Sequence, residues 1–535
     1  MNVPQSVAEV LRDHVTLENE SIDRMYLNVY VPQLQCVGGV VGYLHAHKGQ
    51  RFASTAALAP MTQAFVEAID RFALQQGIEV VQFPRGQRKD EVTRQYLAGY
   101  RKTEGVLYIG KAQEKARVMR TERRRNARTG ASYPWVVQST AMVNHVYFYC
   151  VDEDFGPFFL KFCTYFPYNA KLCINGNEYA KCQLRKRGIA FEALDNGVRC
   201  CENPKALQKI CDALDATKIE RLLRKWLARL PHPFSKRERR VGCRYALSIL
   251  QAEFALTQVL DRPLSGRVFF EDVIRENLDI GRPGHVQLIF ERRISARTPG
   301  RFRTRVITAG VTPSLHLDYK HSRIKQYHKE GQALRTETTI NDTRDFALGR
   351  RLHNLAALRQ VGFAANRRLL TVQTISHDCA LGEADLQRHQ RPAEINGQRA
   401  SALRFADTRV QALMQALLLF VLLPHGFSNR DLREQLAALL GLDPSALRPG
   451  RMTYDLRRLR LHGLIERLPN THRYRLTEQG LKTAMFYTRV YNRILRPGAA
   501  ELRPTAAATP TPLRRHFTAM THAIHSYCDQ AKLAA

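Results

Sequence analysis

Acidic residues are scarce in this chain of 535 residues, which contains 49 Asp and Glu against 82 Lys and Arg. The formal net charge is therefore +33 at pH 7. A surplus of this size is expected of proteins that bind polyanions, and a nucleic-acid backbone is the leading candidate for the polyanion. A membrane surface is the competing candidate, but lipid-binding proteins usually gather their cations on an amphipathic helix or tail, and the sequence shows no such segment.

Long apolar runs and paired cysteines are missing as well. The longest apolar helix that we expect, Leu413–Leu423, is too short to span a bilayer, and the first residues lack the pattern of a secretory signal. The 11 cysteines include no Cys-x-x-Cys pair, although a zinc site assembled from distant cysteines stays an alternative. We therefore expect a cytoplasmic protein with reduced thiols and no membrane partner, and the sequence leaves its oligomeric state open.

A segment near the C-terminus carries the most informative pattern in the chain. An apolar helix is predicted over Val410–Leu423, where Pro424 ends it, and a second helix over Leu432–Gly441 follows the capping residues Ser428 and Asn429. A third helix and two short strands around a polar tip come next. This order of elements resembles the winged helix-turn-helix domains of bacterial transcription regulators.

The third helix is predicted over Thr453–Gly463, with Leu456 and Leu459 on its buried face, and the two strands flank a tip at Pro469–His472. The resemblance implies that this helix and the hairpin beside it contact nucleic acid. A winged helix that contacts only protein is the alternative, but the density of arginine favours phosphate binding. The residues expected to make the contacts are Arg451, Arg457, Arg458, Arg460, His472 and Arg473.

The N-terminal third predicts strands that alternate with helices. The expected strands are Tyr26–Val31, Gly38–Leu44, Ile78–Phe83 and Gly105–Gly110, and the expected helix is Ala64–Gln76. This alternation predicts a mixed α/β domain.

The densest basic run of the chain extends from Lys111 to Arg128. We expect it to contact nucleic acid because the whole chain is strongly cationic, and the alternative is a solvated face of a helix or loop. The residues that would bind phosphates are Lys115, Arg117, Arg120, Arg123, Arg124 and Arg125.

Residues 145–168 are rich in aromatic side chains and predict a hairpin around an acidic turn at Asp152–Gly156. The rings are expected to form the core of a sheet, with stacking on unpaired bases as the alternative. The carboxylates of Asp152, Glu153 and Asp154 suit Mg²⁺. Three successive side chains of a strand cannot all face one ion, however, which favours an exposed turn.

A second hairpin in the middle of the chain carries several reactive side chains. Its predicted strands, Arg323–Tyr327 and Ala333–Ile340, pair across Glu330 and Gly331. The alternation of a strand then places a tyrosine, a lysine and an Arg/Glu pair on one surface. These residues are Tyr327, Lys329, Arg335 and Glu337, of which Arg335 is expected to contact nucleic acid.

This hairpin resembles the Tyr-x-Lys and Leu-Arg-x-Glu hairpin of rolling-circle replication initiators. The resemblance implies that Tyr327 is a nucleophile, that Lys329 stabilises a phosphate or leaving group, and that Glu337 orients the reactants or binds metal. Those enzymes also use a His-hydrophobic-His strand, which His45 and His47 match in spacing, so Mg²⁺ or Mn²⁺ is the expected cofactor. The alternatives are a structural hairpin with a cross-strand ion pair and a polar strand end.

We predict an α+β multidomain protein, in which mixed α/β N-terminal and middle domains precede a winged helix-turn-helix domain. The predicted boundaries are 1–135 for the N-terminal domain, 136–384 for the middle region, 385–400 for a linker, 401–495 for the winged helix-turn-helix domain, and 496–535 for a Pro/Ala-rich linker with a short terminal helix.

The function that these features favour is nucleic-acid binding, with DNA as the first partner, combined with strand processing for a bacterial mobile element. Such processing includes replication initiation, transposition and recombination. A non-catalytic regulator or origin binder and a protein that binds structured RNA are the alternatives. The chain as a whole also resembles a family of long bacterial proteins, and that resemblance implies no particular activity.

Overall fold

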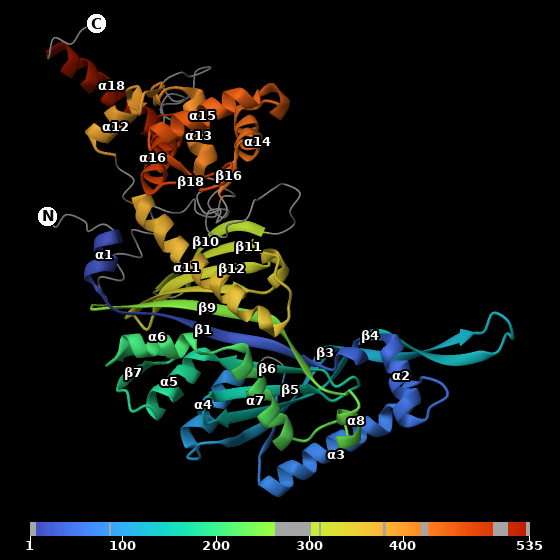
Figure 1. The fold of residues 1–535 in the computed structure, drawn as a ribbon. Helices are drawn as coiled ribbons and strands as arrows, with labels where there is room; N and C mark the ends of the chain where they lie inside the picture. Colours follow the sequence, from blue (N-terminus) through green and yellow to red (C-terminus); the bar gives the residue numbers. More distant parts are fainter. Residues whose placement is uncertain are drawn as a thin grey trace. The chain divides into compact units, whose positions relative to one another are not determined.

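The computed structural model describes residues 7–84, 87–262, 301–309, 312–377, 381–418, 426–495 and 512–530 (Figure 1). The chain divides into two compact units. The larger unit comprises residues 10–272 and 303–367, and the C-terminal unit comprises residues 1–9, 273–302 and 368–535. Both contain helices and strands, in agreement with the predicted α+β class. Among the described helices, none combines the length and the apolar character that a membrane crossing requires.

The described part of the larger unit is built on an 11-stranded sheet in the order β10-β11-β12-β13-β9-β1-β6-β5-β4-β3-β2. Its centre is the antiparallel pair of β1 and β9. On one side β1 pairs with β6, the last strand of the run β3–β6, and on the other β9 pairs with β13, the last strand of the run β10–β13. The strands are β1 Val15–Tyr30, β2 Val80–Gln82, β3 Gly105–Arg125, β4 Ser132–Asp152, β5 Gly156–Cys163, β6 Ala170–Asn175, β9 Ala246–Leu260, β10 Arg301–Ala309, β11 Thr312–Lys320, β12 Ser322–Lys329 and β13 Ala333–Ile340.

Helices cover both faces of this sheet. α3 and α4 lie on opposite faces, since Phe72 of α3 packs on Phe148 of β4, whereas Tyr96 of α4 stacks on Tyr108, which pairs with Tyr149. α11 lies beside α6, where Arg359 Nη1 donates a 2.6 Å hydrogen bond to the Asp212 carbonyl. Gly362 of α11 packs so closely on β9 that an added Cβ would lie 2.3 Å from the Phe254 ring. The helices of the larger unit and the helix that leaves it are α2 Val37–Lys48, α3 Ala59–Gln76, α4 Lys89–Gly99, α5 Gly176–Lys186, α6 Pro204–Asp212, α7 Ala216–Arg229, α8 Lys236–Arg240 and α11 Leu355–His377.

Short elements connect these strands and helices. They are α1 Val7–Asp13, the 3-10 turns η1 Pro32–Gln35, η2 Thr55–Ala57, η3 Thr343–Phe346 and η4 Leu352–Asn354, and the two-stranded sheet of β7 Phe191–Leu194 and β8 Gly197–Cys201. The predicted boundary between residues 135 and 136 falls inside β4, so the structure does not divide the chain there.

Most predicted elements of the N-terminal third are present. The helix Ala64–Gln76 is the second part of α3, and Gly77 ends it with a φ of 62°. The strands expected at Tyr26, Ile78 and Gly105 correspond to β1, β2 and β3. The strand predicted over Gly38–Leu44 is wrong, because these residues belong to α2, whose N-cap is Cys36.

The aromatic region forms the predicted hairpin of β4 and β5, and its rings lie in the core. Tyr108 of β3 stacks on Tyr149 of β4 with 4.5 Å between the ring centroids, and both side chains are buried. Asp152 at the turn is also buried, and its Oδ2 accepts a 2.9 Å hydrogen bond from Trp226 Nε1. The Asp152 carboxylate is therefore part of the packing and not of an exposed acidic turn.

The C-terminal unit contains the three predicted helices, and Leu456 and Leu459 of α15 are buried as expected. The end of the first helix at Pro424 and the segment 496–511 lie outside the described residues. The elements are α12 Glu383–Gln390, β14 Ala393–Ile395, β15 Gln398–Ala400, α13 Thr408–Leu418, β16 Phe427–Ser428, α14 Asn429–Leu440, η5 Pro444–Ala446, α15 Pro449–Leu461, β17 Ile465–Arg467, β18 Arg473–Leu476, α16 Glu478–Arg489, η6 Val490–Leu495 and α18 Pro512–Gln530.

Residues 385–400 are not the linker that their polar, aperiodic sequence predicts. They form most of α12 and the hairpin of β14 and β15, which packs beside α15. His389 of α12 is fully buried, and its Nε2 lies 3.2 Å from Thr483 Oγ1 of α16. This segment is therefore an integral part of the C-terminal unit.

Candidate nucleic-acid interface

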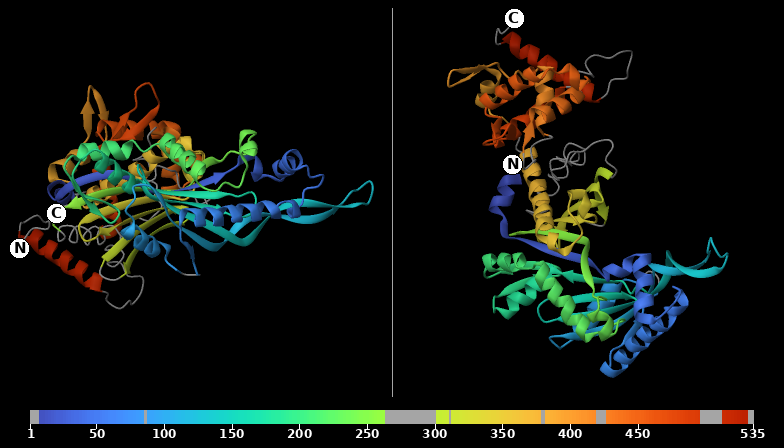
Figure 2. Two further views of the ribbon diagram at one scale, coloured as in Figure 1. Left: turned by 90° about the horizontal axis from the view of Figure 1, so that it is seen from below. Right: turned by 45° about the vertical axis from the view of Figure 1, so that its right-hand side comes forward.

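A long antiparallel ribbon projects from the sheet of the larger unit (Figures 1 and 2). It consists of residues 112–125 of β3 and 132–144 of β4 and is called the arm. β3 is paired with β2 only up to Lys111, and β4 is paired with β5 only from His145 onward, so within the described residues the arm strands pair with each other alone. At about 3.4 Å per residue the arm is about 40 Å long.

The arm carries the basic run identified in the sequence, but as a strand and not as a helix or loop face. Arg124 pairs with Glu122 at 2.7 Å, and in the described structure the other cations of the arm and its tip have no ion pair. Strand alternation places them on both faces of the ribbon. The exposed cations are Lys115, Arg117, Arg120, Arg123, Arg124, Arg125 and Arg128, against the single acid Glu122 between residues 115 and 144.

The arm contacts the body of the larger unit well beyond the point where it leaves the sheet. Thr121 Oγ1 lies 2.7 Å from Thr55 Oγ1 of η2, and Gln138 Nε2 donates a 2.6 Å hydrogen bond to the Gln35 carbonyl of η1. Near the tip, Arg124 lies 5.5 Å from the Trp135 ring, which is a cation–π distance. The arm is thus held against the body as far as Thr121 and Gln138, and the exposed side chains of Arg123, Arg124, Arg125 and Arg128 lie beyond these contacts.

A second basic surface, which the sequence analysis missed, lies on α8. It is called the α8 patch and consists of the exposed side chains of Lys236, Arg237, Arg240 and Arg244, none of which has an ion pair in the described structure. The Lys-Arg-Glu-Arg-Arg sequence at 236–240 is the signal that could have identified it.

The one acid of α8, Glu238, points inward and not toward the patch. Its Oε1 accepts a 2.6 Å hydrogen bond from the Tyr43 hydroxyl and lies 2.8 Å from Lys48 Nζ of α2. Burial opposes ionisation of Glu238, but the contacts from Lys48 and Tyr43 prevail and lower the pKa of the carboxyl to about 2. The internal pairing of Glu238 leaves the outer face of α8 purely cationic.

His45 and His47 do not form the predicted metal pair. They lie in α2, where residues two positions apart point about 200° from each other around the helix axis. His45 is exposed, whereas the His47 ring packs 5.3 Å from the Tyr43 ring. The described residues contain no group of three or more His, Cys, Asp or Glu side chains that could hold a metal ion.

The middle hairpin does bring two of its predicted catalytic residues together. The Tyr327 hydroxyl donates a 2.8 Å hydrogen bond to Glu337 Oε1. Burial and the Glu337 carboxylate raise the pKa of Tyr327. Lys329 instead lies 3.5 Å from Glu330, and the lysine over the Tyr327 ring is Lys325, 4.0 Å from its centroid.

Arg335 is fully buried, so the expectation that it contacts nucleic acid is wrong for this structure. Its Nε lies 2.7 Å from Glu337 Oε1, and its Nη2 lies 3.0 Å from Asp23 Oδ2 of β1. Burial and the neighbouring Asp23 carboxylate raise the pKa of Glu337, although Arg335 opposes them. The guanidinium therefore holds together the buried Asp23 carboxylate and the carboxyl group of Glu337, whose side chain is 16% exposed.

In the C-terminal unit, α15 exposes one continuous stripe. Its side chains are Arg451, Tyr454, Arg457 and Arg460, which recur at helical spacing. The Arg457 and Arg460 guanidinium groups lie beside β15, 3.5 Å from the Arg399 carbonyl and 3.4 Å from Gln398 Oε1, and both remain exposed. This stripe is the surface that α15 offers to a partner.

Two other residues of this unit that were predicted to contact nucleic acid form hydrogen bonds within the protein. Arg458 is buried and donates hydrogen bonds to the carbonyls of Ser401 and Ala402. Arg473 donates a 2.8 Å hydrogen bond to the Gly426 carbonyl. His472 is exposed at the tip between β17 and β18. Of these three residues, Arg458 is the one that is withdrawn from solvent, since the Arg473 side chain is still 41% exposed.

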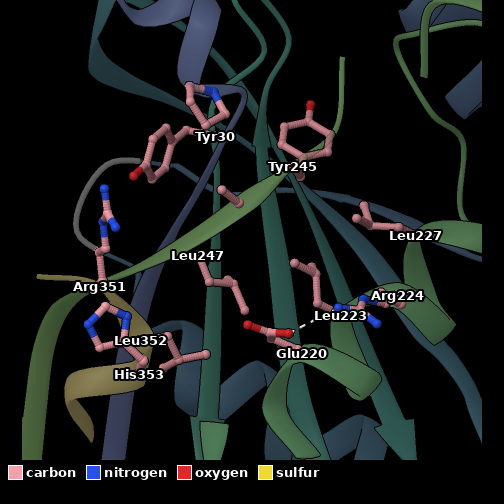
Figure 3. Close-up of a pocket in the computed structure, with 12 residues that line it drawn as sticks. Tyr30, Glu220, Leu223, Arg224, Leu227, Tyr245, Leu247, Arg351, Leu352 and His353 are labelled. Atoms are coloured by element: carbon pink, nitrogen blue, oxygen red, sulfur yellow. Dashed lines mark hydrogen bonds and ion pairs between the residues drawn. The ribbon is translucent and has the colours of Figure 1, made fainter. Parts of the chain in front are cut away.

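A cavity of about 470 Å³ lies elsewhere in the larger unit (Figure 3). Arg351 and His353 of the η4 region and Tyr30 of β1 line one part of it, and Glu220 of α7 pairs with Arg224 in another part. None of the candidate catalytic, metal-binding or nucleic-acid-binding residues named in the sequence analysis lines this cavity.

Comparisons of the chain with protein-family models, with curated proteins and with solved structures find no match. The partner of the protein must therefore be inferred from its own surfaces.

Proposed function

We propose that the protein binds nucleic acid, with duplex DNA as its first partner. The observation that carries this proposal is the segment 115–144 of the arm and its tip, which has seven exposed cations and a single acid, Glu122. A two-stranded ribbon fits the major groove of B-DNA, and unpaired lysine and arginine side chains bind phosphates with release of counterions. Structured RNA is the alternative partner. Side chains cannot read its deep and narrow major groove, so the same cations would contact only its backbone.

The C-terminal unit supports the proposal through its order of elements. Three helices, α13, α14 and α15, are followed by the hairpin of β17 and β18, and β16 joins that hairpin as a third strand. In a winged helix-turn-helix domain the third helix enters the major groove. The exposed stripe of Arg451, Tyr454, Arg457 and Arg460 occupies the corresponding helix here and would contact bases and phosphates.

The decisive experiment measures DNA affinity against salt concentration by fluorescence anisotropy. Arg123→Ser combined with Arg125→Ser removes two unpaired cations of the arm, and Arg221→Ser combined with Arg224→Ser removes the same charge from exposed positions of α7. We expect the arm variant to reduce the slope of log K against log salt by about 2, whereas the α7 control leaves it near the wild-type value. Equal reductions of the slope in both variants would mean that the cations of the arm contribute no more to DNA binding than other exposed cations.

Strand processing is a second candidate, favoured by the hydrogen bond from Tyr327 to Glu337. In this scheme the Tyr327 oxygen attacks a backbone phosphorus and forms a phosphotyrosine bond. The bond from phosphorus to the leaving strand's oxygen breaks, and the phenol proton passes to Glu337. A non-catalytic regulator or origin binder would have the same surfaces without this step.

A further inference from the structure

A second cavity lies where the arm leaves the body of the larger unit. Its volume is about 580 Å³, within the range of small-ligand sites. The arm contributes one wall and η2 with the start of α3 contributes another. Phe166 and Tyr165 close it from the segment after β5.

The lining combines an apolar interior with polar groups. Leu58, Met119 and Val143 are buried apolar residues of this lining. Hydroxyl and amide groups of residues such as Thr62 and Gln63 can supply hydrogen bonds. This is the composition that binds a planar ring carrying polar edges.

Two side chains of the lining remain available to a ligand. Tyr165, in the segment after β5, is 42% exposed, whereas the next aromatic residue, Phe166, is buried. Arg120 is exposed and has no ion pair in the described structure. An exposed ring and an unpaired guanidinium on the lining of one cavity are suited to a base that stacks and to the phosphate attached to it.

We infer that this cavity accepts an unpaired nucleobase of the DNA that the arm binds. The inference rests on the proposed function and adds to it a preference for bulged or single-stranded positions. The base stacks on Tyr165, its polar edge faces the hydroxyl and amide groups, and Arg120 contacts the adjoining phosphate. The cations of the arm hold the flanking backbone, so the unpaired base is delivered to the mouth of the cavity.

The test compares a fully paired DNA duplex with the same duplex carrying one bulged nucleotide, by fluorescence anisotropy with the full chain. Wild type should bind the bulged probe more tightly. Tyr165→Ala should lower affinity for the bulged probe by about 5- to 150-fold, the effect of losing one base–aromatic stack, and leave the paired duplex unchanged. Ala141→Phe, which fills the cavity from the exposed arm surface, should act in the same way.

Tyr527→Ala is the matched control, because Tyr527 is an exposed tyrosine of α18 in the C-terminal unit. It should leave both affinities unchanged. A wild-type protein without preference for the bulge, or a preference that survives both cavity variants, would overturn the inference. So would self-association of the wild type that Tyr165→Ala abolishes, since a second copy would then occupy the cavity. Failure to bind either probe would instead refute the proposed function itself.

Discussion

The Tyr327 hydroxyl donates a 2.8 Å hydrogen bond to the same Glu337 oxygen that lies 2.7 Å from Arg335 Nε. One carboxylate oxygen thus joins a phenol at the edge of the hairpin to a guanidinium in the core of the sheet. The Asp23 carboxylate extends this set on the far side of Arg335 and accepts hydrogen bonds from the amides of Asn177, at 3.0 Å, and Asn196, at 2.5 Å.

Tyr327→Phe tests the strand-processing candidate. If the hydroxyl is the nucleophile, cleavage of labelled single- and double-stranded DNA in Mg²⁺ or Mn²⁺ disappears, together with any covalent adduct on a denaturing gel. DNA affinity should stay unchanged, because the arm and α15 are untouched. Cleavage at the wild-type rate by the phenylalanine variant would remove Tyr327 from the reaction. Binding without cleavage by the wild type would favour the non-catalytic regulator.

Arg335→Leu should destabilise the larger unit by about 3–5 kcal/mol. The substitution leaves the buried carboxylate of Asp23 and the partly exposed carboxyl group of Glu337 without their common cation. Urea unfolding followed by circular dichroism measures the loss. The control is Arg88→Ala, which removes an arginine that is 82% exposed and 3.5 Å from Glu91, and it should change the free energy of unfolding by less than about 1 kcal/mol.

Neighbouring arginines of α15 should respond in opposite ways to truncation. Arg457→Ala removes an exposed cation and should weaken DNA binding while leaving stability near the wild-type value. Arg458→Ala removes a buried guanidinium and its hydrogen bonds to the carbonyls of Ser401 and Ala402, and it should cost about 1–3 kcal/mol of stability. Anisotropy and thermal unfolding separate the two effects. Stability losses of equal size would contradict the assignment of Arg457 to a binding surface.

Removal of two cations of the α8 patch should weaken binding to all DNA sequences by the same factor. Lys236→Ser with Arg237→Ser should reduce the salt slope by about 2 if each side chain neutralises one phosphate. Because phosphates carry no sequence information, the ratio of affinities for two different duplexes should not change. A change in that ratio without a change in slope would place base recognition on α8.

Acidification should destabilise the C-terminal unit over the pH range in which His389 becomes protonated. Burial lowers the pKa of this imidazole to about 4, from an ordinary value of 6.5. The unfolded chain therefore binds the proton more tightly, and the stabilisation present above pH 6.5 is lost as the pH falls toward 4. From pH 7 to pH 5 we expect His389 to account for a loss of about 2 kcal/mol, which His389→Gln should remove. Burial also lowers the pKa of the neighbouring His462, whose contribution should remain in the variant. A pH dependence unchanged by the substitution would place the titration elsewhere.

Local patterns in the sequence predicted most helices and strands of both units. The prediction of a strand at Gly38–Leu44 was wrong because the helix there depends on contacts with residues outside the segment. An added Cβ at Gly39 would lie 1.6 Å from the Gln33 carbonyl oxygen, and Tyr43 bonds to Glu238, 195 residues later. Neither relationship is visible in the period of the apolar residues.

The candidate site was predicted in part for a similar reason. Exposed cations such as Arg123 and Arg457 follow directly from the charge pattern. Burial of Arg335 and Arg458 does not, because their partners are supplied by β1 and by the segment after β15. An arginine is expected outside unless a carboxylate or carbonyl meets it, and that meeting is decided by the tertiary fold.

The arm also exposes the outer backbone edges of two long strands, which are templates for pairing with another chain. Each copy of the protein therefore presents a potential aggregation surface. The cations that line the ribbon cause electrostatic repulsion between neighbouring copies. Neutralising these cations should therefore lower the solubility of the protein as well as its affinity for DNA. Bound polyanion would mask that repulsion, and filament formation at low protein-to-DNA ratios would then compete with dispersed complexes.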